Sequence, residues 1–120
     1  MKTHRLRDLI IWQKSMVLVK DIYLLTENIP VTEKFGLISQ IRRCAVSIPS
    51  NIAEGAGRNN PKEFNQFLGI ANGSSYELET QLILLVDLNF KSEDEIQPLL
   101  NILTEIQKMI YKFNNTLMSS

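Results

Sequence analysis

The sequence predicts an all-α protein: an antiparallel up-down-up-down bundle of four helices in a single domain covering residues 1–120. Three observations support this fold class. Apolar residues recur at spacings of three and four along most of the chain, no segment alternates as a strand would, and the breaks between periodic segments are short. The chain is also long enough to bury a core without a disulfide or a structural metal.

The first helix is expected over residues 8–29. Two apolar stripes run along it, and the segment between Met16 and Leu25 is apolar nearly all the way round. A helix on the surface of a small monomer normally carries one apolar face. This helix is therefore expected either to be unusually buried or to pack against another subunit.

The second helix is expected to begin near Thr32 and to end at Gly55 or Gly57, because glycine favours helix termination. Pro49 lies inside it and removes the backbone hydrogen bond to Ala45. The apolar period nevertheless keeps its phase across Pro49. The sequence therefore favours one helix kinked at Pro49 over two short helices.

The third helix is expected to start at Asn60-Pro61 and to run to about Phe90. Asn60 is a typical N-cap residue, Pro61 suits the first helical position, and Glu63 follows at the third. Small residues around Gly73 allow a neighbouring backbone to approach closely. The alternative is a break in the helix at Asn72-Gly73.

The fourth helix is expected to begin near Ser92, which forms a capping box with Glu95. Pro98 predicts a loosened first turn or a restart of the helix at residue 97 or 98. The apolar residues of this helix follow an unbroken heptad stripe: Ile96, Leu99, Leu103, Ile106, Ile110, Phe113 and Leu117.

Composition excludes several classes of protein. Cys44 is the only cysteine and His4 the only histidine, so zinc sites, haem attachment and a ferritin-like di-metal site lack ligands and no cofactor is expected. Cys44 is interpreted as a packed thiol in a reducing compartment. No apolar run is long enough to span a membrane and the N-terminus does not resemble a signal peptide, which predicts a cytoplasmic protein.

The charge is neutral overall but unevenly distributed. Residues 1–62 hold 10 Lys+Arg and 5 Asp+Glu (10 − 5 = +5), whereas residues 63–120 hold 3 and 8 (3 − 8 = −5). Arg42, Arg43, Arg58 and Lys62 are the candidate nucleic-acid contacts in the basic half. These residues either form salt bridges within or between subunits, or bind phosphate.

Two carboxylates form the only candidate catalytic pair. Glu54 follows the expected kink and Glu77 follows the patch of small residues, so the two are candidates to face each other as a paired acid and base. The alternative, which we favour, is that they are structural polar groups satisfied by the backbone and by Arg42 or Asn51. Neither a Ser–His–Asp nor a Cys–His arrangement is available.

Five ordered motifs, within about residues 6–117, resemble the four-helix-bundle proteins encoded in intervening sequences of 23S rRNA genes. The motifs are DLIIWQK at 8–14, GLISQIRR at 36–43, SIPSNIAEGAGR at 47–58, EFxxFL at 63–68 and GSSYELETQL at 73–82. Pro49, Asn51, Glu54, Gly55 and Glu77 are the signature positions within them, interpreted as structural. The resemblance implies a homopentameric ring without established enzymatic activity. The chain also resembles the accessory bundle proteins of diversity-generating retroelements, which bind reverse transcriptase and nucleic acid.

Three functional hypotheses follow. The first is a non-enzymatic, oligomeric interaction or assembly module with itself or another protein as partner. The second is an RNA-binding accessory protein in which a ring repeats a modest basic surface several times. An enzyme that uses Glu54 and Glu77 is a distant third.

Overall fold

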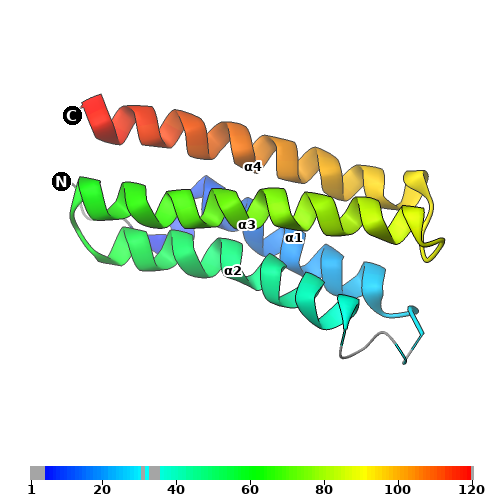
Figure 1. The fold of residues 1–120 in the computed structure, drawn as a ribbon. Helices are drawn as coiled ribbons and strands as arrows, with labels where there is room; N and C mark the ends of the chain where they lie inside the picture. Colours follow the sequence, from blue (N-terminus) through cyan, green and yellow to red (C-terminus); the bar gives the residue numbers. More distant parts are fainter. Residues whose placement is uncertain (1–4, 31, 33–35, 120) are drawn as a thin grey trace.

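The structure is a computed structural model that describes residues 5–30, 32 and 36–119, with side chains as far as Asn114. It contains one short turn of 3-10 helix, η1 (Leu6–Asp8), and four helices: α1 (Ile10–Thr26), α2 (Leu37–Gly57), α3 (Pro61–Asp87) and α4 (Glu93–Ser119). The four helices lie side by side (Figure 1), and no strand occurs among the described residues. The prediction of an all-α four-helix bundle is confirmed.

The arrangement of the helices follows from their contacts. α1 packs against α2 and α4, and α3 also packs against α2 and α4. α1 and α3 therefore occupy diagonally opposite corners of the bundle, as do α2 and α4. All four helices contribute apolar side chains to one continuous core, whose largest fully buried members include Phe64, Leu18, Ile41, Leu82 and Ile96.

Helix α1 is shorter at both ends than the expected span of 8–29. Leu9 is extended (φ −77°, ψ 112°), so the helix begins at Ile10 after the separate turn η1. At the other end Pro30 disfavours helical backbone at Ile29, and the helix ends at Thr26. The turn nevertheless keeps Ile29 in the core, with 7% of its surface exposed.

Helix α2 is continuous through Pro49 and ends at Gly57, as predicted, but it begins at Leu37 instead of Thr32. Residues 33–35 of the predicted first turns lie outside the described residues. The left-handed residue after the helix is Asn59 (φ 53°), not a glycine. Gly55 has a different purpose: a Cβ there would lie 2.8 Å from Phe64 Cδ1 and 2.9 Å from Phe67 Cβ, so its absence lets α2 and α3 approach closely.

Helix α3 begins as predicted, because the Asn60 side chain accepts a hydrogen bond of 3.0 Å from the backbone N–H of Glu63. It is unbroken across Asn72 and Gly73, which rules out the break considered as an alternative. It ends at Asp87, and the chain turns through Asn89, whose φ is 62°. The predicted end near Phe90 was therefore three residues late.

Helix α4 begins with the predicted capping box. The Ser92 N–H donates to Glu95 Oε1 at 3.0 Å, and the Glu95 N–H donates to Ser92 Oγ at 3.2 Å. Of the two outcomes expected at Pro98, a loosened first turn or a restart, the restart does not occur, because the helix runs without interruption from Glu93 to Ser119. Pro98 and Asp94 are both exposed, so water can reach the carbonyl that the proline leaves without a donor. The stripe is buried from Ile96 to Ile110, and the side chain of Leu117 lies outside the described residues.

Candidate interaction faces and the α2–α3 polar network

The Arg42 side chain is directed toward α1. Its Nε donates to Thr26 Oγ1 at 2.9 Å, and its guanidinium carbon lies 4.5 Å from the centre of the Tyr23 ring. Thr26 is itself buried and donates to the carbonyl of Ile22 at 2.8 Å. Arg42 therefore links α2 to α1 through a hydrogen bond and a cation–π contact, and its guanidinium is less available to an outside phosphate.

Arg58 is also engaged, at the opposite end of α2. It forms an ion pair of 3.5 Å with Glu54, and its guanidinium carbon lies 5.1 Å from the centre of the Phe67 ring. Arg43 and Lys62 are exposed. Because a helix rises 1.5 Å per residue, Arg43 lies about 22 Å along α2 from Arg58. The structure therefore places Arg58 and Lys62 on either side of the α2–α3 turn and leaves Arg43 far from both.

A network of small polar groups joins α2 to α3. The Cys44 Sγ donates to the Ser74 carbonyl at 3.0 Å, and the hydroxyl oxygens of Ser47 and Ser74 lie 2.9 Å apart. Asn51 Nδ2 donates to the Ser47 carbonyl at 2.8 Å and to Ser47 Oγ at 2.9 Å. The expected close approach at the small residues of α3 is thus made by Ser74. Gly73 is exposed and has no neighbour within 4 Å of its would-be Cβ.

Cys44 has the environment of an inert thiol. Only 6% of its surface is exposed. Burial, and secondarily the negative charge of Glu77, raise the pKa of the Cys44 thiol to about 12. Because the thiolate is the nucleophile, a thiol with such a pKa is unreactive near neutral pH. The interpretation of Cys44 as a packed residue fits this environment.

The two candidate catalytic carboxylates do not meet. Cys44 is level with Ser74, and Gly55 is level with Phe64, so α2 and α3 run in opposite directions at this contact. Glu77 is then level with the beginning of α2, roughly 18 Å along the axis from Glu54. Glu54 is paired with Arg58 instead. The geometry excludes a direct acid and base pair between these two residues.

The surface of the bundle carries an unequal distribution of large apolar side chains. Among the described residues, α1 exposes five of them and α3 exposes four, whereas α2 and α4 expose one each. The exposed residues are Ile10, Met16, Val17, Tyr23 and Leu24 on α1; Ile70, Tyr76, Ile83 and Leu84 on α3; Val46 on α2; and Tyr111 on α4. The sequence indicated the α1 set, but we did not predict the α3 set.

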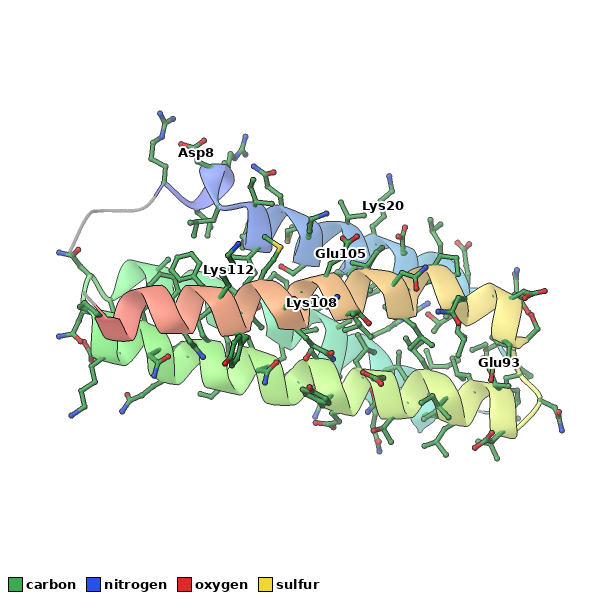
Figure 2. The ribbon with its side chains drawn as sticks, turned by 90° about the horizontal axis from the view of Figure 1, so that it is seen from above. Asp8, Lys20, Glu93, Glu105, Lys108 and Lys112 are labelled. Atoms are coloured by element: carbon green, nitrogen blue, oxygen red, sulfur yellow. The ribbon has the colours of Figure 1, made fainter. Side chains whose placement is uncertain are left out.

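A shallow groove lies between α1 and α4. Ile10 and Val17 line it from α1, and Ile102 lines it from α4. Lys14 and Glu105 bridge it with an ion pair of 2.9 Å, and Glu105 lies on the side of α4 that faces α1 (Figure 2). The α1 face is therefore a row of exposed apolar groups with charged groups beside it.

Other types of site find no support in the part of the chain that the structure describes. Histidine, cysteine and acidic side chains there form no group of three suited to a metal ion. No described helix is long and apolar enough to cross a membrane.

Comparison with known proteins identifies the family of the chain. The sequence profile of the family described as 23S rRNA-intervening sequence protein matches residues 7–112. The chain belongs to this family. A crystal structure of a protein of unknown function from the S23 ribosomal protein family of Bacteroides thetaiotaomicron is similar at 26% sequence identity, with a TM-score of 0.78 over 88% of this chain and 98% of that one. No functionally curated protein matches the chain.

The motifs by which the chain resembles the intervening-sequence family have a structural explanation. SIPSNIAEGAGR forms the second half of α2, and GSSYELETQL forms the middle of α3. The polar network joins these two segments, since Ser47 and Asn51 belong to the first and Ser74 belongs to the second. These motif residues therefore form part of the packing interface between α2 and α3.

Proposed function

We propose that this member of the intervening-sequence family is a non-enzymatic module that self-associates and serves as an interaction or assembly unit. The observation that carries the proposal is the outer face of α1. Five large apolar side chains are exposed on a helix of 17 residues. The core of the bundle does not require them, because α1 also buries Ile11, Leu18 and Ile22. Apolar patches of this kind are typical of protein interfaces.

The subunit number that we propose is five, from the resemblance to pentameric members of the family. In such a ring every copy contributes the same surface, so a contact that is weak in one copy is repeated around the assembly. No catalytic step is assigned, because Glu54 and Glu77 lie far apart and the Cys44 thiol is buried.

RNA binding through Arg42, Arg43, Arg58 and Lys62 is the competing hypothesis. The contacts give it less support, since Arg42 is held by Thr26 and Arg58 is paired with Glu54. The net charge of the chain is zero, whereas sequence-independent nucleic-acid binding usually comes with a basic domain.

The test is the mass of the purified protein, measured by size-exclusion chromatography with light scattering. The protein is purified without nuclease at low salt, and absorbance is read at 260 and 280 nm. Val17→Glu places a charge in the α1 face, and Thr104→Glu adds the same charge to the exposed polar face of α4 as the matched control. Circular dichroism verifies that both variants remain folded.

We expect the wild type and Thr104→Glu to elute as the same multiple of the 13.8 kDa chain with a protein-like absorbance ratio, and Val17→Glu to elute at lower mass. A wild-type monomer would contradict the proposal. A multimer with excess absorbance at 260 nm and an RNA affinity that falls steeply with salt would support the RNA-binding hypothesis instead.

A further inference from the structure

We infer that the contact between copies is heterologous: the α1 face of one copy (Ile10, Val17 and Leu24) packs on the α3 face of the next (Ile70, Glu77 and Leu84). The inference rests on the proposed self-association and specifies its geometry. Its starting point is that the exposed apolar side chains gather on two helices, α1 and α3. These helices lie at diagonally opposite corners, so they cannot contribute to one continuous patch. Each copy therefore offers two separate apolar faces.

The two faces have matching lengths and spacings. Ile10, Val17 and Leu24 are exposed by 57%, 53% and 56%, and each follows the previous one after seven residues. On α3, Ile70 and Leu84 are exposed by 52% and 39%, and Glu77 lies midway between them. Seven residues bring a helix back to nearly the same side. Each row is therefore a straight line of three side chains about 21 Å long.

The charges of the two faces are complementary. α1 carries two lysines and one aspartate (2 − 1 = +1), whereas α3 carries one lysine and four acidic residues (1 − 4 = −3). Lys20 lies one turn from both Val17 and Leu24, and Figure 2 shows its side chain pointing away from the bundle. Glu77 is exposed at the centre of the α3 row. Opposite charges on two apolar surfaces favour their association and oppose wrong pairings.

The same charges oppose the alternative symmetric contacts. Pairing two α3 faces would bring the Glu77 carboxylates of both copies into one interface, and pairing two α1 faces would do the same with Lys20. Like charges brought together in this way are unfavourable. A heterologous contact leaves an unused α1 face at one end and an unused α3 face at the other. It therefore propagates until a ring closes, or else forms a filament.

The test uses two variants that each disable one face. Val17→Glu disables the α1 face and keeps the α3 face, because the new carboxylate would meet Glu77, whereas Leu84→Lys does the reverse, because the new ammonium group would meet Lys20. The double variant, measured alone, shows whether the two disabled faces pair with each other. Each variant is measured alone and in an equimolar mixture by light scattering. The control mixture combines Val17→Glu with the Val17→Glu/Leu84→Lys double variant, which has no intact face, and circular dichroism verifies that all variants are folded.

We expect each variant alone to be monomeric and the mixture to form a complex of twice 13.8 kDa, because one intact α1 face meets one intact α3 face. The control mixture is expected to remain monomeric. A mixture that gives no complex, or a Leu84→Lys variant that assembles like the wild type, would overturn the heterologous contact while leaving self-association in place. A monomeric wild type would overturn both.

Discussion

Two diagonal pairs of helices differ in how they use their apolar residues. The outer faces of α2 and α4 are polar, apart from Val46 and Tyr111 among their described side chains, so these helices are amphipathic in the ordinary way. α1 and α3 also bury inward stripes but expose a second set of large apolar groups. The difference shows that the fold accounts for the inward stripes alone. The outward residues of α1 and α3 require another explanation, which self-association provides.

The first prediction compares the truncation of two leucines of α3, one on its buried inner side and one on its exposed outer side. Leu82 is fully buried, whereas Leu84 is 39% exposed. Leu82→Ala should lower the free energy of unfolding by about 2–5 kcal/mol, because it leaves a cavity in the core. In an assembly-deficient background such as Val17→Glu, Leu84→Ala should cost less than ~1 kcal/mol. Urea denaturation measures both, and equal losses would mean that the outer face of α3 supports the monomer.

The second prediction concerns the α2–α3 contact, where Cys44 is buried. With the pKa of Cys44 raised to about 12, the thiolate is rare at pH 8, and its reaction with an aromatic disulfide reagent should be slower than in urea by a factor of about 1000. The raised pKa of Cys44 also makes the stability of the folded protein depend on pH. A thiol whose folded pKa is raised stays protonated after the unfolded chain has lost its proton, so stability should fall as pH rises from about 9 toward 12.

Cys44→Ala is the matched control for that pH dependence. It removes the titrating group and should flatten the loss of stability in this alkaline window. Rapid labelling of the folded wild type at pH 8 would show instead that the α2–α3 contact opens frequently.

The third prediction contrasts two glycines. Gly55→Ala would place a methyl group 2.8 Å from Phe64 Cδ1 at the α2–α3 contact, and should destabilise the protein by about 1–3 kcal/mol. A Cβ added at Gly73 would meet no atom within 4 Å, so Gly73→Ala should stabilise α3 by roughly 0.5–1 kcal/mol. Thermal unfolding of both variants tests the contrast, and a loss of stability in Gly73→Ala would contradict it.

The smallest effect is expected at the start of α4. The hydrogen bond from the backbone N–H of Ser92, and more weakly the charge of Lys91, hold the pKa of Glu95 below its ordinary value. A carboxyl whose folded pKa is lowered stabilises the protein above its unfolded pKa, and this contribution is lost as pH falls through the folded value. The difference in Tm between the wild type and Glu95→Gln should therefore be larger at pH 7 than at pH 3. A constant difference would mean that the carboxylate does not act through its charge.

The sequence was most informative where a local interaction determines the structure. The caps at Asn60 and Ser92 and the inward stripe of α4 depend on neighbouring residues, and each was located correctly. Pro98 was misjudged because its cost depends on whether water reaches the carbonyl of Asp94, which is a matter of tertiary exposure.

The candidate site was harder to predict, because it depends on which helix faces which. The distance between Glu54 and Glu77 follows from the alignment of α2 and α3, and the contact of Arg42 with Tyr23 follows from the packing of α1. The α3 face was missed because its apolar residues alternate with Glu77, Thr80 and Asp87, which gave that side of the helix a polar character in the sequence.

The most direct test of the central claim leaves the chain unaltered. Hydroxyl-radical footprinting with mass spectrometry compares Leu24 in the α1 face, Leu84 in the α3 face and Tyr111 on α4, which are exposed by 56%, 39% and 71% in the single copy. We expect Leu24 and Leu84 to be oxidised far more slowly in the native protein than in the monomeric Val17→Glu variant, while Tyr111 reacts equally in both. Equal oxidation of all three residues in the two proteins would show that the α1 and α3 faces remain uncovered, and would contradict the account.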